Sequence, residues 1–347
     1  VLDGVGKPSA VSADTTTTVN VTAVNDQTVV TLLPSTTIAF TEGDANVRLA
    51  SAITLTDADN NRLSSATIAL GTGFDGAKET LVLDGKTVTT GSMVAGNNWT
   101  ISNVNSTGIS ASFDKTTGVL TLSGTQDIQA YQQIMRLVSY SNTSDDPTAS
   151  GSSRAINWTV TDADNLASTQ VSTTVNLTAI NNAPTLTGLS GSALAFTEGT
   201  PLVLGNAVIL ADADDTELSS ATVWISQGFT QGDTLSINAG SLTHNYNAAT
   251  GELTLSGNAS LATYQAALRS VQFSSGDDPT SISNTRQISW QVTDANSDGV
   301  GAKASDPVAV LKVNVTPVNN AAVITNGANS FSFTEGDSAK VIDAGLV

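Results

Sequence analysis

Copies of one long unit recur along the chain, and this internal repetition constrains the fold more than any other feature. The phrase DADNNRLSSATI at 57–68 returns as DADDTELSSATV at 212–223. Further along, TTGVLTLSG at 116–124 returns as ATGELTLSG at 249–257. Because the copies recur in the same order, they predict successive structural units rather than one large core.

The spacing of the copies predicts four segments. The phrase FTEG occurs three times and marks the start of successive copies. The segments are the C-terminal end of a preceding repeat at 1–27, a complete repeat at 28–182, a second complete repeat at 183–320 and the start of a following repeat at 321–347. We therefore expect an interior piece of a longer repeat array.

The first complete repeat carries an insertion that the second lacks. Its surplus residues include GNNWTISNVNSTG at 96–108, which predict an extra hairpin projecting from the body of the repeat. One interpretation is ordinary variation in loop length. The other is a partner-binding hairpin, in which an exposed Trp99 would make the contact.

Most of the repeated phrases have the pattern of β-strands. In the segment that holds Val175, Leu177 and Ala179, apolar residues alternate with Asn and Thr, which is typical of a half-buried strand. Turn signals such as TTG, DDP and NAP separate these segments at short intervals. The pattern predicts an all-β fold of tandem Ig-like or cadherin-like antiparallel β-sandwich repeats.

One segment in each repeat departs from the strand pattern. Leu261, Tyr264, Leu268 and Val271 are spaced as one face of a helix, behind Ser260 as a candidate N-cap. We expect one short amphipathic helix per repeat, lying across an open edge or end of the sandwich, with its tyrosine in the core.

Composition excludes several classes of function. The chain has 31 acidic and 13 basic residues and a formal net charge of −18, so nucleic acid and anionic membranes are poor partners. It has no cysteine, and no apolar run approaches the length of a membrane span. His244 is the only histidine, so no triad or metal site built on histidines can form within the chain. We predict a protein that is not an enzyme, with His244 in a structural position at a strand or hairpin edge.

Acidic and amide residues gather at predicted strand ends and turns, where they are repeated in both units. Seven Lys or Arg fall between residues 28 and 182, too few to neutralise them. Ca²⁺ binds six to eight oxygens from carboxylates, amides and carbonyls, and is the cation that such a set favours. The alternative is that Asp and Asn simply cap turns. The candidate ligands are Asn25, Asp26, Glu42, Asp57, Asp59, Asp145, Asp146, Asp162, Asp164, Asn181, Asn182, Glu198, Asp212, Asp214, Asp277, Asp278, Asp294, Asn319 and Asn320.

The order of these motifs resembles that of cadherin-like repeats, which place a Glu, a DxD, an acidic turn, an Asp and an Asn/Asp-rich linker in succession. The repeated sequence phrases also resemble those in the tandem repeats of giant bacterial surface adhesins, including the RTX type. The resemblance covers essentially the whole chain. It implies calcium ions between consecutive domains of a secreted or surface-anchored protein.

Carried over residue by residue, the resemblance implies three junctions. The first keeps Asn25, Asp26, Asp57, Asp59 and Asp162. The second takes Glu42, Asp145, Asp146, Asn181, Asn182, Asp212, Asp214 and Asp294. The third keeps Glu198, Asp277, Asp278, Asn319 and Asn320. The linker departs from the family pattern at Thr178 or Ala179 and at Asn182, which implies fewer ions or weaker binding, about 10⁻⁴ to 10⁻³ M. Alternatively, the pairs Asp162/Asp164 and Asp212/Asp214 hold ions inside single domains.

The expected function is structural: repeats that calcium stiffens into a spacer, whose partners are neighbouring repeats of the same chain. A host or matrix glycan or protein would be bound by another domain. Two alternatives stay open at this point. One is a glycan- or protein-binding module, and the other is a calcium-independent spacer of a matrix or sheath filament.

Overall fold

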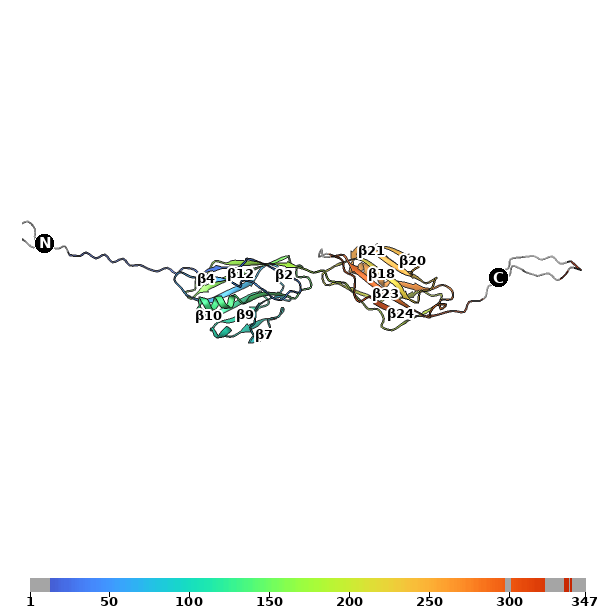
Figure 1. Cartoon of the computed structure of the whole chain (residues 1–347), viewed down its shortest axis with the longest axis horizontal. Coiled ribbons are helices and arrows are strands. Elements are labelled where there is room, and N and C mark those ends of the chain that lie inside the picture. Colours follow the sequence, from blue (N-terminus) through green and yellow to red (C-terminus); the bar gives the residue numbers. More distant parts are fainter. Residues whose placement is uncertain (1–12, 297–300, 322–333, 337, 339–347) are drawn as a thin grey trace, which may run out of the picture. The chain divides into compact units, whose positions relative to one another are not determined.

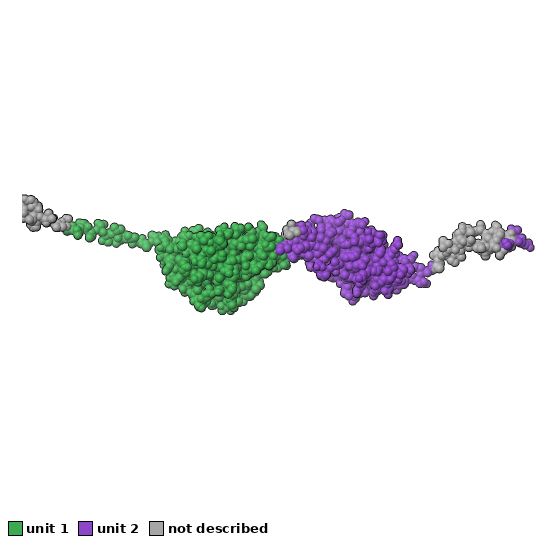
Figure 2. Space-filling model, in the orientation of Figure 1, with its two compact units in different colours: residues 1–179 green, residues 180–347 purple. Residues whose placement is uncertain are grey.

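The computed structural model describes residues 13–296, 301–321, 334–336 and 338. The chain divides into two compact units, Val1–Ala179 and Ile180–Val347 (Figure 2). In the described residues, each unit combines several β-sheets with one α-helix (Figure 1). The predicted all-β class is confirmed, whereas the four predicted segments stay a prediction. Most of segment 321–347 lies outside the described residues.

Unit 1 is built on an eight-stranded sheet that faces a smaller one. The large sheet has the order β2 (Thr37–Thr41), β13 (Val171–Thr178), β12 (Ser153–Asp162), β5 (Arg62–Leu70), β10 (Val119–Asp127), β9 (Ser110–Asp114), β8 (Trp99–Ile101) and β7 (Thr90–Gly91). The smaller sheet contains β3 (Val47–Arg48), β11 (Val138–Asn142) and β6 (Glu79–Leu83). A separate pair joins β1 (Val29–Thr31) to β4 (Thr54–Thr56). Strand β2 runs parallel to β13, and the other pairings are antiparallel.

Unit 2 repeats this plan with a shorter main sheet. Its order is β15 (Leu194–Thr197), β24 (Ala309–Thr316), β23 (Thr285–Asp294), β18 (Glu217–Gln227), β21 (Glu252–Ser260) and β20 (Thr243–Asn247). The second sheet contains β16 (Leu202–Val203), β22 (Gln272–Ser274) and β19 (Thr234–Ser236), and a further pair joins β14 (Thr185–Thr187) to β17 (Ile209–Ala211). As expected, His244 lies in a strand at the edge of the sheet, where its side chain is exposed.

The hydrophobic core of each unit follows the predicted alternation. In β12, Ile156, Trp158 and Val160 are fully buried, and the residues between them are only partly buried. The aligned strand β23 buries its own apolar residues in the same way. Burial of a large apolar side chain contributes about 1.5–3 kcal/mol. These strands therefore form the centre of each sandwich.

Among the described residues, each unit contains one α-helix, as predicted, and α2 lies where the apolar spacing predicts it. Helix α2 (Leu261–Arg269) begins at Ser260, whose Oγ accepts a hydrogen bond from the backbone N–H of Thr263 at 3.2 Å. The Tyr264 hydroxyl donates to the carbonyl of Gly257 at 2.8 Å, while its ring is buried. Helix α1 (Ile128–Met135) makes the same tyrosine contact in unit 1. The predicted helix and its N-cap are confirmed.

The insertion in unit 1 extends the sheet and contributes to the core. Strand β8 pairs with β9, so that Trp99 faces Phe113, and the two rings stack with centroids 6.2 Å apart. Trp99 is 1% exposed, and its indole N–H donates to the Leu81 carbonyl at 3.1 Å. The prediction of an exposed Trp99 is therefore wrong, because pairing with β9 turns this side chain inward. A surface contact through Trp99 is excluded with it.

Candidate metal centre

The predicted ligands of each unit lie at two opposite ends of its main sheet. In unit 1, Asp162 ends β12, whereas Glu42 follows β2, and its N–H donates to the carbonyl of Thr178 at the end of β13. Strands β12 and β13 are antiparallel, so these two ends are on opposite sides of the unit. Unit 2 has the same arrangement, with Asp294 at the end of β23 and Glu198 beside Thr316 at the end of β24. We call the predicted ligands near Asp162 or Asp294 the upstream cluster of their unit. Those near Glu42 or Glu198 are its downstream residues.

The upstream cluster of unit 2 brings three carboxylates together. One oxygen from each of Asp212, Asp215 and Asp294 lies within 4.8 Å of the other two. Asp212 and Asp215 belong to the turn after β17, and Asp294 is the last residue of β23. Asp215 and Asp294 are buried. Three oxygens at this separation can bind a single cation between them.

Asn181 and Asn182, in the segment before β14, add a side-chain amide and a backbone amide to this cluster. The Asn181 Nδ2 donates to Asp294 Oδ2 at 3.0 Å and to the Gly301 carbonyl at 2.9 Å. Asn181 is fully buried, yet its Oδ1 accepts no hydrogen bond from the described residues. The backbone N–H of Asn182 donates to Asp214 Oδ2 at 2.6 Å. A buried amide oxygen without a donor is costly unless a ligand meets it.

The carboxylate of Asp212 shows the same deficit. Its Oδ2 is buried and has no hydrogen-bond partner among the described residues. Burial, followed by the contact with the Asp214 carboxylate, raises the pKa of Asp212 to about 7. The three ion pairs between described residues join Arg48 to Asp84, Arg154 to Glu79 and Arg286 to Asp233, and none of them reaches Asp212. A cation would therefore stabilise the ionised form of this side chain.

The upstream cluster of unit 1 has the same layout, repeats two of these hydrogen bonds and adds a third. Asn25 Nδ2 donates to Asp162 Oδ2 at 2.8 Å, and the Asp26 N–H donates to Asp59 Oδ2 at 3.1 Å. The Thr28 hydroxyl donates to Asp57 Oδ2 at 2.6 Å.

These bonds change the titration of Asp57. Partial burial acts to raise the pKa of Asp57, but hydrogen bonds from Thr28, Asn60 and Asp59 outweigh it and hold that pKa below its ordinary value. Asp164 joins the cluster through a 3.0 Å bond from Asn60 Nδ2.

The downstream residues are only partly brought together. Glu198 Oε2 accepts the Val318 N–H at 2.8 Å, and its Oε1 accepts Asn320 Nδ2 at 3.2 Å, so Glu198 and Asn320 share one location. Asn319 is exposed beside them in sequence. In unit 1, Asp145 is exposed, and Asp146 Oδ1 accepts the N–H and hydroxyl of Thr148. Asp277 and Asp278 are both exposed in the equivalent turn.

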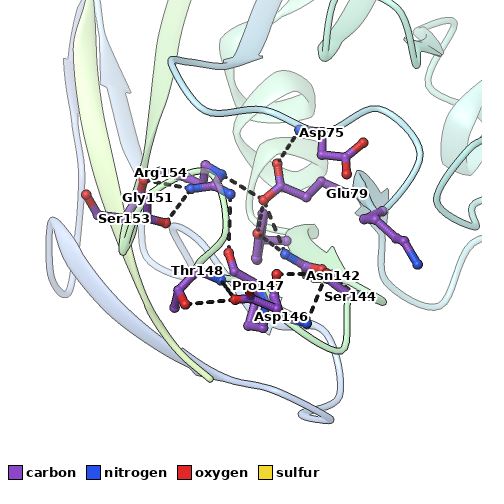
Figure 3. A network of polar contacts seen from close by, with 12 residues as sticks. Asp75, Glu79, Asn142, Ser144, Asp146, Pro147, Thr148, Gly151, Ser153 and Arg154 are labelled. Carbon is purple, nitrogen blue, oxygen red and sulfur yellow. Dashed lines mark hydrogen bonds and ion pairs between the residues drawn. The ribbon is translucent and has the colours of Figure 1, made fainter. Parts of the chain in front are cut away.

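Buried arginines hold the acidic turns, a feature that the sequence analysis missed. In unit 1, Arg154 pairs with Glu79 at 2.7 Å and donates to the carbonyls of Pro147 and Gly151, which flank the end of the Asp145–Asp146 turn (Figure 3). Tyr140 and Asn142 also donate to Glu79.

Unit 2 repeats the arrangement with a shorter acid. Arg286 pairs with Asp233 at 2.6 Å and donates to the carbonyls of Pro279 and Ser283. An aligned Arg at the start of both central strands was the only available signal in the sequence.

Fold and site together define a pair of all-β sandwich units, each with a cluster of oxygen donors at the end where its chain begins. In the described part of the chain, no helix is both long and apolar enough to cross a membrane. No family model matches the chain. Over 106 residues it is 32% identical to halomucin of Haloquadratum walsbyi, a match that covers 30% of this chain and 1% of halomucin.

Solved structures with some similarity include human and bacterial domains. Human protocadherin-24 EC1-2 is 12% identical, with 85% of this chain and 100% of that chain covered and a TM-score of 0.27. Human CDH23 EC21-23 is 13% identical, with 81% and 72% covered and a TM-score of 0.30. The fibronectin(III)-like modules of Clostridium thermocellum CbhA are 12% identical, with 83% and 95% covered and a TM-score of 0.22. At these values no residue role is transferred from them.

Proposed function

We propose that the chain is a pair of non-enzymatic, calcium-binding structural repeats from a long extracellular adhesin of the cadherin-like, RTX type. The ions would stiffen the connection between successive repeats. The observation that carries the proposal is the upstream cluster of unit 2. There, carboxylates of Asp212, Asp215 and Asp294 converge beside an Asn181 oxygen that accepts no hydrogen bond.

The chemistry of the donors favours calcium over other divalent cations. The donors are carboxylate and amide oxygens, which are hard ligands suited to Ca²⁺. Zinc prefers cysteine and histidine, and the chain has no cysteine and a single histidine that is distant in sequence from the cluster. Magnesium demands a regular octahedron and usually retains several waters. A mixed set of carboxylate and amide oxygens suits the larger ion.

A structural role fits the duplication of the cluster. An active site is normally unique, whereas Asn25, Asp57 and Asp162 in unit 1 occupy the positions of Asn181, Asp212 and Asp294 in unit 2. The predicted partners are the neighbouring repeats, and another domain of the parent protein would bind a host or matrix glycan or protein. The extracellular location is part of the same proposal and follows from the resemblance of the repeated motifs to those of surface adhesins.

A calcium-independent spacer is the second candidate. It is favoured by the complete hydrophobic cores and by the buried pairs Arg154–Glu79 and Arg286–Asp233, which hold each unit together without an ion. The two candidates differ in what a chelator does.

The test compares the whole chain in millimolar calcium and in EDTA by calorimetry and small-angle scattering. We expect calcium to raise the melting temperature and to narrow the distribution of particle dimensions, since an ion at 100 times its Kd adds about 2.7 kcal/mol of stability. Asp212→Asn should reduce the gain in melting temperature, whereas the exposed control Glu252→Gln should retain it. Identical melting and scattering in calcium and EDTA would leave the calcium-independent spacer.

A further inference from the structure

We infer that the two upstream clusters bind calcium unequally: the cluster of unit 2 is the tight site and that of unit 1 the weak one. This inference rests on the proposed function and makes it more specific. A count of carboxylates predicts the reverse order. Unit 1 contributes Asp26, Asp57, Asp59, Asp162 and Asp164, whereas unit 2 has Asn182 and Asn296 at the positions of Asp26 and Asp164 and gains only Asp215.

The first reason is a hydroxyl that unit 1 has and unit 2 lacks. Thr28 directly precedes β1, and its Oγ1 donates to Asp57 Oδ2 at 2.6 Å. Pro184 directly precedes β14 in unit 2, and proline has neither a hydroxyl nor an N–H to donate. Asp212 Oδ2 is accordingly buried without a donor. A cation in unit 1 must compete with the threonine hydroxyl for this oxygen, whereas in unit 2 no hydrogen-bond donor among the described residues competes for it.

The second reason is the residue three positions after the first aspartate of the turn. In unit 1 this is Asn60, whose amide is engaged twice: Nδ2 donates to Asp164, and Oδ1 accepts the N–H of Arg62 at 3.0 Å. In unit 2 it is Asp215, whose carboxylate lies buried with those of Asp212 and Asp294. Unit 2 therefore has a third carboxylate, that of Asp215, where unit 1 has the neutral and already hydrogen-bonded amide of Asn60.

Burial adds to the difference. Asn181 is fully buried, whereas its equivalent Asn25 is only half-buried. Repulsion between carboxylates is screened less when water is excluded, so the ion-free cluster of unit 2 is the less stable of the two. Binding of a divalent cation relieves that repulsion. The gain in free energy is therefore larger in unit 2, despite its smaller number of acids.

The test is calorimetric titration of the whole chain with calcium, in wild type and in five variants. We expect two classes of site that differ by about tenfold or more in Kd. Asp212→Asn should abolish the tight class, and Asp57→Asn should abolish the weak one. Asp215→Asn should weaken the tight class by about tenfold and leave the weak class unchanged. Thr28→Val, which keeps the shape and removes the hydroxyl, should strengthen the weak class.

Each outcome has a defined meaning. No heat of binding in wild type would overturn both the proposed function and this inference. Binding with a single Kd, or a tight class that survives Asp212→Asn, would overturn the inference alone. A Thr28→Val variant that keeps its fold by circular dichroism and binds no more tightly would also overturn it. Because Asp145 and Asp146 are predicted ligands too, the double variant D145N/D146N is included, and the gap between the classes must persist in it.

Discussion

Asp212 combines a buried oxygen without a donor and a carboxylate neighbour, and both raise the energy of its ionised form. Its pKa in the folded, ion-free chain is about 7, against an ordinary value of 3.8. A group whose pKa is raised by folding favours the folded state most when it is protonated. This contribution is fully present below about pH 3.8 and is lost as the pH rises through about 7.

In EDTA, we therefore expect the stability of unit 2 to fall as the pH rises from about 4 to about 7 and to level off above that, apart from the effects of other groups. Thermal melts across this range would measure the effect, and Asp212→Asn should remove it. In calcium the sign reverses: affinity should rise over the same range, because the ion displaces a proton. Titrations at pH 7 in buffers of different ionisation enthalpy should show release of about half a proton, and release of none would contradict the assignment.

Arg154 and Glu79 form a fully buried pair that a single substitution would break. Arg154→Met leaves the Glu79 carboxylate without its counter-charge, so we expect a loss of about 3–5 kcal/mol in the stability of unit 1. The double variant Arg154→Met, Glu79→Leu should recover part of that loss. Urea denaturation of the three chains measures it. A double variant as unstable as the single one would mean that the pair mainly positions the acidic turn.

Individual site residues were predicted from the sequence only where they belong to a motif that recurs in both repeats. The recurring DAD and Asn motifs led to Asp57, Asp212 and Asn181. Asp215 was missed because unit 1 has an asparagine at that position and a comparison of copies hides it. Asp233 and Arg286 were missed because 53 positions separate them and only the folded sheet brings them together.

Among the elements, the two helices offer a matched comparison of N-caps. Ser260 accepts a hydrogen bond from Thr263 at the start of α2, whereas Asp127 makes no such side-chain bond at the start of α1. Removing a serine cap costs about 1 kcal/mol. Ser260→Ala should therefore destabilise unit 2 by about this amount, and Asp127→Ala should change unit 1 by less than about 0.5 kcal/mol. Chemical denaturation compares the two, and equal losses would contradict the assigned caps.

The elements that the sequence predicted best are those with a clear period. Alternation identified β13, and the helical spacing identified α2, because each pattern reports burial on one face. The insertion was harder. A hairpin could be expected from its turns, but the side on which Trp99 lies depends on pairing with β9, and no local pattern reveals that partner.

At the scale of the whole molecule, the important feature is that the predicted oxygen ligands of each unit lie at both ends of the same sheet. Because β12 pairs antiparallel with β13, Asp162 and Glu42 lie at opposite ends of the sheet in unit 1. The antiparallel pairing of β23 with β24 separates Asp294 from Glu198 in the same way in unit 2. A sandwich with this polarity can contribute to a site at either end without using its faces. Such a unit is suited to serial repetition, in agreement with the repeats in the sequence.

The parallel pairing of β2 with β13, and of β15 with β24, has a mechanical consequence. Each pair joins a strand near the beginning of its unit to the last strand, in register from Thr37 opposite Thr174 to Thr41 opposite Thr178 in unit 1. Tension applied to the two ends of the chain would slide these strands past each other along their length. The backbone hydrogen bonds between the two strands would then bear the load simultaneously instead of breaking one after another. Each unit would therefore resist pulling before its core is exposed.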